Sequence, residues 1–403
     1  MNEVRVDVVP RGFTLAVVNI THGLYHLGSQ GMGVLYPVLR EQFAFGYMGI
    51  AVLSLVTQLV TGPMQITFGV LTRFVRRTYI LGIGAILGFF GMGGLAVSQT
   101  YGHLVASRAI RGLGTSPLHP VGGAILASSF PEDRAKALGL HHTAGNVGGL
   151  VAPLVVGALL HFMGWRPVVV VLSLPLLLMS FLCFSLKEPP PQADVGARHR
   201  GRGRLGLEEY KAVFQDRNAL ILALVMMVGA AGRGTGVLQT YLTAFLVDRY
   251  GISVSFAALF LAAYTFGGVA GPLAMGWLAD RTAPRLAIRL DLLLSAVFVL
   301  LILRPSTPGI ALGAFVFLSG FFIHSRTTLL QTLLIQTGPQ DARIDTLLSV
   351  YFTMAAITGP VWTLLIGTVV DWAGMGTALG VMAASHISGM ALLGFMQIDH
   401  SPK

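Results

Sequence analysis

Residues 254–303 read VSFAALFLAAYTFGGVAGPLAMGWLADRTAPRLAIRLDLLLSAVFVLLIL, and this stretch decides the fold class. It holds two apolar runs, 254–279 and 285–303, and a short polar segment between them that carries Asp280 and Arg281. About 20 predominantly apolar residues are enough to cross the hydrocarbon core of a bilayer as an α-helix. The stretch therefore predicts two transmembrane helices joined by a short loop.

The same pattern recurs along the whole chain of 403 residues. The chain is 54% hydrophobic and 11% charged, whereas soluble domains carry about 25% charged residues, so an ordinary soluble protein is excluded. Its single cysteine, Cys183, excludes an intrachain disulfide and a zinc cluster of thiolates. Breaks at polar, Pro and Gly residues predict an all-α polytopic membrane protein with twelve transmembrane helices, at residues 12–39, 47–71, 79–98, 103–129, 136–162, 166–186, 217–248, 254–279, 285–303, 308–337, 343–370 and 375–397.

The net charge of +10 follows from the topology of these spans. With both termini in the cytoplasm, most of the 27 Lys and Arg residues fall in cytoplasmic segments, as the positive-inside rule requires. The outer loops hold only Arg40, Arg166, Arg249 and Arg304. The basic excess therefore indicates the lipid bilayer as the partner and argues against nucleic acid. We expect no cleavable signal peptide, because the segment before the first span is acidic in part and no small-residue cleavage site follows.

The longest hydrophilic stretch, 187–216, divides the spans six and six. It predicts an N-terminal six-helix bundle at 1–186, a basic cytoplasmic linker at 187–216 and a C-terminal six-helix bundle at 217–403. The linker is expected to be solvated, with contact to lipid headgroups as the alternative. The two bundles are expected to be pseudo-symmetric, because several glycines of the first recur 205–210 residues later, and Tyr36 recurs as Tyr241.

Several short motifs resemble those of the major facilitator superfamily of transporters. The segment Gly276-Trp-Leu-Ala-Asp280-Arg281 is similar to the superfamily's loop motif, and its first-half equivalent begins at Gly69 but has Arg73 in place of the acid. Arg108-x-x-x-Gly112-x-Gly114 and Gly164-Trp165-Arg166 also match motifs of the superfamily. The resemblance implies two bundles that rock about a central site, and roles in gating or coupling for Arg108, Gly69, Gly276, Asp280 and Arg281.

Cationic side chains inside the predicted spans carry the information on the substrate. Arg111, Arg233 and Arg326 lie well inside spans, whereas Asp291 is the only acidic residue that does. Each buried Arg costs about 2.5–3.5 kcal/mol or more unless it has a partner. The imbalance predicts a small anionic substrate held by the three arginines, and a role in gating or coupling for Asp291.

Histidines are the second group of candidate site residues. His22 and His26 are four residues apart and so share one helix face, His119 stands beside Pro120, and His324 is near Arg326. Because the imidazole pKa lies near neutrality, these side chains are candidates for substrate binding and proton transfer. No third metal ligand is evident beside His22 and His26, so no metal and no cofactor are predicted. No His-Glu-x-x-His and no ATP-binding glycine motif occurs, which argues against an enzyme and a primary pump.

The first 160 residues resemble the fosmidomycin-resistance type of efflux protein. The resemblance rests on Thr21-His22-Gly23 with His26, on Leu118-His119-Pro120, and on the glycines that follow Gly145-Asn146. It implies proton-driven export of a small anionic drug. We therefore predict a monomeric, proton-coupled secondary transporter of a small organic anion in a bacterial inner membrane, with export favoured. The alternatives are an importer of a carboxylate, sugar or peptide-like nutrient, and a membrane receptor that transports nothing.

Overall fold

The computed structural model describes residues 11–187, 206–229, 237–339 and 344–397. Every regular element within these ranges is helical and none is a strand, which confirms the predicted all-α class. The chain divides into two compact units, Met1–Phe45 with Val52–Gly196 and Gly46–Ala51 with Ala197–Lys403.

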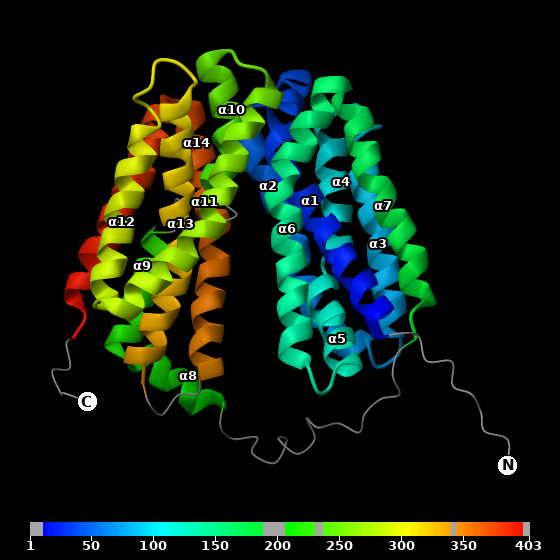
Figure 1. The fold of residues 1–403 in the computed structure, drawn as a ribbon, viewed down its shortest axis with the longest axis horizontal. Helices are drawn as coiled ribbons and strands as arrows, with labels where there is room; N and C mark the ends of the chain where they lie inside the picture. Colours follow the sequence, from blue (N-terminus) through cyan, green and yellow to red (C-terminus); the bar gives the residue numbers. More distant parts are fainter. Residues whose placement is uncertain (1–10, 188–205, 230–236, 340–343, 398–403) are drawn as a thin grey trace. The chain divides into compact units, whose positions relative to one another are not determined.

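The predicted spans of the first half have helical counterparts, which Figure 1 colours from blue to green. The fourth span is not one continuous α-helix, because a π-helical turn, η1, interrupts it at His119 and Pro120. Pro120 has no N–H to donate, and the chain re-forms its hydrogen bonds around that gap. The elements are α1 (Arg11–Phe43), α2 (Tyr47–Leu71), α3 (Arg77–Gly93), α4 (Tyr101–Thr115), η1 (Leu118–Gly122), α5 (Gly123–Ser129), α6 (Arg134–Phe162) and α7 (Trp165–Ser185).

The second half shows the same correspondence between predicted spans and helices. The seventh span appears as α9 and α10, on either side of residues outside the described ranges, and the last two spans run together in α14 across Gly374, whose φ is 80°. Part of the predicted linker, 188–205, also lies outside the described residues, and its last part is α8. The elements are α8 (Gly206–Gln215), α9 (Arg217–Val228), α10 (Val237–Tyr250), α11 (Val254–Arg281), α12 (Pro284–Leu301), α13 (Ile310–Thr337), α14 (Ile344–Leu392) and a 3-10 turn, η4 (Leu393–Phe395).

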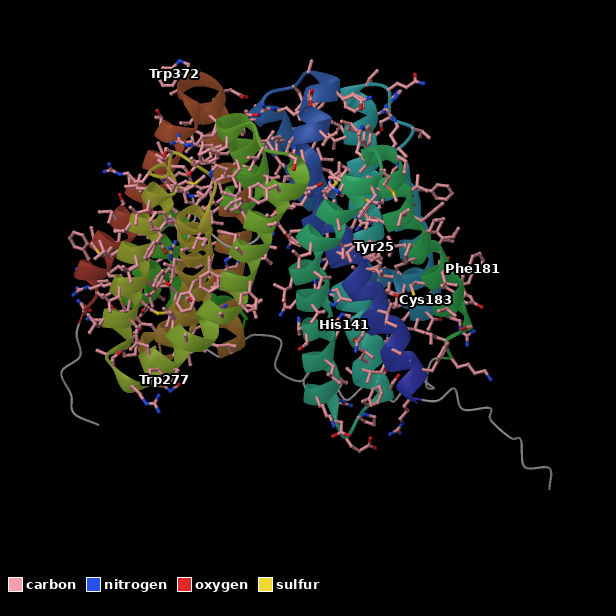
Figure 2. The ribbon with its side chains drawn as sticks, turned by 45° about the horizontal axis from the view of Figure 1, so that its top comes forward. Tyr25, His141, Phe181, Cys183, Trp277 and Trp372 are labelled. Carbon is pink, nitrogen blue, oxygen red and sulfur yellow. The ribbon has the colours of Figure 1, made fainter. Side chains whose placement is uncertain are left out.

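The outer faces of the helices are apolar, as contact with lipid requires. Six helices of the described part are long and apolar enough to cross a membrane. Large hydrophobic side chains are exposed along them: Phe181 on α7 is 63% exposed and Leu273 on α11 is 75% exposed (Figure 2 labels Phe181). Since these side chains would face water in a soluble protein, their position favours a membrane-embedded chain.

Glycines set the closest helix crossing in the second unit, between α11 and α13. A Cβ on Gly320 would meet the backbone carbonyl of Tyr264, and one on Gly271 would meet that of Phe321. Small residues are what allow membrane helices to approach this closely. The crossing matters for function because α13 also carries His324 and Arg326.

Gly320→Ala is expected to destabilise the protein by about 1–3 kcal/mol, because its methyl group would have to push two helix backbones apart. The control is Gly313→Ala on the same helix, where the nearest atom to the new Cβ is in the ring of Phe260, at 3.9 Å. That variant is expected to be neutral or slightly stabilising, since Ala favours helix more than Gly. Thermal unfolding of both variants in detergent checks the difference, and equal melting temperatures would contradict it.

Candidate functional site

Five histidines from three elements form one cluster inside the first unit. His22 and His26 come from α1, His119 from η1, and His141 and His142 from α6. The ring centroid of His22 lies 4.7 Å from that of His26, 4.9 Å from that of His119 and 4.0 Å from that of His141. His142 adjoins His119 and His141 with centroids 6.2 Å away in each case. The cluster, which we call the histidine cluster, thus joins residues more than 100 positions apart.

The α1–α6 crossing holds this cluster together. His22 is 1% exposed, and its Nδ1 lies 2.8 Å from the backbone oxygen of His141. A carbonyl oxygen only accepts, so Nδ1 carries the proton and Nε2 keeps its lone pair. The ring packs directly against α6, because a Cβ on Gly145 would lie 2.8 Å from its Cε1 atom. His141, on the same helix (Figure 2), places its Nδ1 3.1 Å from Oδ1 of Asn19.

Two of these imidazoles keep an unpartnered nitrogen in the interior. The Nε2 atoms of His22 and His141 are buried without a hydrogen-bond partner in the described part of the chain. Buried polar atoms in proteins are nearly always paired, so such atoms mark a place where a proton, an ion or a ligand completes the structure. The histidine cluster is therefore the chemically open part of the first unit.

Arg111 lies in the same unit, 1% exposed, and ties three helices together. From α4 its guanidinium donates to the carbonyl oxygens of Tyr25 on α1, at 3.0 Å, and Gly88 on α3, at 3.4 Å. It also stacks 4.8 Å from the centre of the Tyr25 ring. Backbone oxygens and an aromatic face thus take the place of a carboxylate partner.

Arg108 has a similar environment one turn earlier on α4. It is 4% exposed, and its Nε donates to the backbone oxygen of Leu53 on α2 at 3.1 Å. Thr57 on α2 in turn donates to the carbonyl oxygen of Arg108 at 3.2 Å. The residue therefore couples α4 to α2, and its Nη1 has no partner within the described ranges.

Arg326 forms the densest polar network of the second unit. Its Nε lies 3.4 Å from Oδ2 of Asp291, its Nη2 3.0 Å from the hydroxyl of Ser295 and its Nη1 3.1 Å from Nδ1 of His386. Its Nη1 also donates to the backbone oxygen of Gly229. All three partner side chains are fully buried, and Oδ1 of Asp291 has no partner among the residues that the structure describes. Asp291 and Arg326, which the sequence analysis placed in separate roles, are one ion pair.

The arginines of the two units occupy equivalent positions. Arg111 is on the fourth span of its half and binds the first and third; Arg326 is on the fourth span of its half and also binds the first and third. The internal repeat predicted from sequence thus extends to the arginine contacts. The difference lies in the partners, which are neutral carbonyls for Arg111 and include a carboxylate for Arg326.

Other predicted site residues lie apart from these networks. His324 is half-buried on α13, with Nδ1 2.9 Å from the backbone oxygen of Gly320 and its ring 5.2 Å from that of Tyr264. Arg233 falls outside the described residues.

Four of the predicted gating or coupling residues, Gly69, Gly276, Asp280 and Arg281, lie near helix ends. Gly276 is in the last part of α11 with open space around its Cα, and Asp280 and Arg281 are exposed at the end of that helix. The guanidinium of Arg281 stacks 3.9 Å from the ring centre of Trp277. Gly69 lies near the end of α2.

Sequence reasoning did not select His141, His142, Ser295 and His386 as site residues. His141 and His142 follow a helix start by about two turns, and no local pattern distinguishes them from surface histidines. His386 is in the last span, where the available signal is one ionisable residue among apolar and small residues. Such intramembrane polar residues are functional candidates by default.

The sequence profile of the Major Facilitator Superfamily matches residues 18–363. The chain is 27% identical over 344 residues to a putative metabolite transport protein of Haemophilus influenzae, covering 84% of each chain. It is 22% identical to the fosmidomycin resistance protein of Escherichia coli, covering 93% of this chain and 91% of that protein. It is 25% identical to a 4-hydroxybenzoate transporter of Pseudomonas aeruginosa, covering 90% and 83%.

Solved structures show the same fold at low sequence identity. The nucleoside transporter NupG aligns with a TM-score of 0.78 at 13% identity, covering 96% of this chain and 100% of that one. A bacterial homologue of the human lysosomal transporter Spinster aligns with a TM-score of 0.74 at 17% identity, covering 95% of both. Since the profile match extends from the first span into the eleventh, the chain belongs to the Major Facilitator Superfamily and is a multi-pass membrane transporter.

Proposed function

We propose that this protein is a secondary transporter that moves a small organic anion together with or against protons by alternating access. The observation that carries the proposal is the set of charged and ionisable side chains in the first unit. Arg108, Arg111, His22 and His141 are buried among its helices, His26 is half-buried, and His119 and His142 are exposed. The only acidic residue within α1–α7 is Glu41, which is exposed near the end of α1.

Such an interior attracts negative charge. Arg111 contributes a permanent positive charge whose bonds are to neutral carbonyls, so its field is not cancelled locally. The histidines add positive charge when they take up protons, and this links anion affinity to proton binding. A cationic substrate would require a buried carboxylate in this unit, and the described helices of the unit contain none in their interior.

We assign substrate contact to His22, His26, His119 and Arg111 in the first unit. In the second unit we assign it to Arg233, His324 and Arg326. Arg326 already forms an ion pair with Asp291, so its positive charge acts on a substrate when Asp291 takes up a proton. Asp291 then serves as the coupling carboxylate, because its Oδ1 has no partner among the described residues.

The relatives' names support an anion. One relative transports 4-hydroxybenzoate, a carboxylate, and another confers resistance to fosmidomycin. We propose export as the direction, from the similarity to the fosmidomycin resistance protein, and import of a carboxylate as the second candidate, from the similarity to the 4-hydroxybenzoate transporter. We further propose a monomer in a bacterial inner membrane that transports and does not catalyse.

Membrane vesicles of the two orientations test function and direction together. Labelled 4-hydroxybenzoate and fosmidomycin are the probes, and tetraphenylphosphonium is the cationic control. Right-side-out vesicles with an inward proton gradient accumulate the probe if the protein imports it with protons. Inverted vesicles with an acidic lumen accumulate it if the protein exports it in exchange for protons. Uptake of the cation alone would overturn the anion assignment.

His119→Gln is expected to slow anion uptake by about 10- to 100-fold, because a hydrogen bond to a charged group contributes about 1.5–3 kcal/mol. His119 is exposed, so this variant should fold normally. His161→Gln is the matched control, since His161 is also exposed but lies at the end of α6, away from the cluster. Vesicle uptake rates at saturating and low substrate check the prediction, and equal rates for the two variants would contradict it.

A further inference from the structure

We infer that His22, His26 and His119 form a binding site for one transition-metal dication of the zinc type. Each residue offers one imidazole nitrogen, and these three nitrogens all lie within 4.8 Å of one another. The inference concerns metal binding by the protein alone, so it does not rest on the proposed transport function.

The distances are close to those of a three-histidine site. Zn²⁺ binds imidazole nitrogen at about 2.0–2.1 Å. Three nitrogens at the corners of a triangle with 4.8 Å sides lie about 2.8 Å from its centre, so each ring needs to move inward by less than about 1 Å. Two of the rings are on one helix face four residues apart, a spacing that suits chelation.

The fold supplies the third ligand that sequence spacing did not reveal. His119 belongs to the π-helical turn η1, which begins at Leu118. π-Helical turns within α-helices occur frequently at functional sites. Here the turn, which contains Pro120, brings the His119 ring 4.9 Å from that of His22 and 6.3 Å from that of His26.

His22 is prepared as a metal ligand in its protonation state. Its Nδ1 donates to the backbone oxygen of His141, and its Nε2 is buried with no partner. Histidine ligands commonly donate their other ring N–H to a carbonyl, which fixes the tautomer and increases the basicity of the ligating nitrogen. A buried nitrogen lone pair without a partner is costly, and a metal ion would satisfy it.

The ligand set selects the class of metal. Neutral imidazoles suit Zn²⁺, Co²⁺, Ni²⁺ and Cu²⁺, whereas Mg²⁺ and Ca²⁺ prefer oxygen ligands. Three protein ligands leave a fourth tetrahedral position, which in such sites holds water or another small ligand. The three ligands carry no negative charge, so an anion at the fourth position would reduce the net charge of the bound ion.

Titration of the full-length, tag-free protein in detergent tests the inference. Isothermal titration with Zn²⁺ is expected to give one ion per chain, and Co²⁺ is expected to produce the visible absorption of a four-coordinate ion. Mg²⁺ at the same concentration should give neither signal. The inference is overturned if the protein binds no Zn²⁺, or if Co²⁺ added to the protein gives no absorption in the visible range.

Variants separate this site from metal binding by other histidines. His119→Gln and His26→Gln are each expected to weaken Zn²⁺ binding by roughly 100-fold or more, since loss of an outer-shell partner alone costs about 10- to 100-fold. His103→Gln and His161→Gln, at exposed positions, should bind as wild type does. The melting temperature without metal shows that each variant is folded. Unchanged Zn²⁺ affinity in folded His119→Gln or His26→Gln would refute the inference, whatever the transport assays show.

Discussion

Asp291→Asn is expected to lower the free energy of unfolding by about 3–5 kcal/mol, which is the cost of leaving one charge of a buried ion pair without its partner. Asp291 and Arg326 are 0% and 2% exposed, so neither charge has water available as a substitute. The remaining partners of the guanidinium are Ser295, His386 and the carbonyl of Gly229. None of these three groups carries a negative charge that could replace the carboxylate. The midpoint of denaturation in detergent measures the loss.

The matched control for this variant is Asp280→Asn, because Asp280 is exposed at the end of α11. It should change stability by less than about 0.5 kcal/mol. The double variant Asp291→Asn with Arg326→Gln removes both charges and is expected to recover a substantial part of the loss, as coupled neighbours do. Wild-type stability of Asp291→Asn would show that the pair is not formed in the folded protein.

Arg111→Met is expected to reduce anion uptake by about 100-fold or more while leaving the protein folded, because it removes one of the two buried arginine charges of the first unit. The carbonyls that it releases, those of Tyr25 and Gly88, are inside α1 and α3 and belong to helices whose own N–H groups still bind them. Their loss therefore costs far less than the loss of Asp291 does. Uptake of labelled 4-hydroxybenzoate into vesicles, with the melting temperature measured in parallel, checks both parts.

Arg76→Met serves as the control for a general effect of charge, since Arg76 is exposed and stacks only on Tyr79, at 5.6 Å. It should transport at the wild-type rate. A folded Arg111→Met variant with wild-type uptake would remove Arg111 from the substrate site and leave it a purely structural role.

The helices were predictable from sequence because each span is a long apolar run whose ends carry polar residues. The pairing of His22 with His26 was also predictable, since residues four apart on a helix share a face. Arg326 was predicted to lack a carboxylate partner, yet Asp291 on the neighbouring helix pairs with it. Thirty-five positions separate the two, and which face each helix turns to its neighbour depends on packing that no local pattern encodes.

The histidine cluster shows the same limit. His119 and His141 belong to different helices, and their approach to His22 depends on the π-helical turn and on the close α1–α6 crossing. At the α1–α6 crossing, a Cβ on Gly148 would meet the backbone oxygen of Gly23, so this contact requires a glycine. The sequence alone does not show which glycines make such contacts, because glycines are abundant throughout this chain.

The contacts of the two equivalent arginines also have a consequence for how the chain is made. Arg111 binds only residues that precede it, Tyr25 and Gly88, so both partners have been synthesised when the fourth span leaves the ribosome. Among the described residues, the hydrogen-bonded partners of Arg326 also precede it, apart from His386. Each arginine therefore enters the bilayer beside helices that already offer it acceptors, which offsets an insertion cost of about 2.5–3.5 kcal/mol at the moment when it arises.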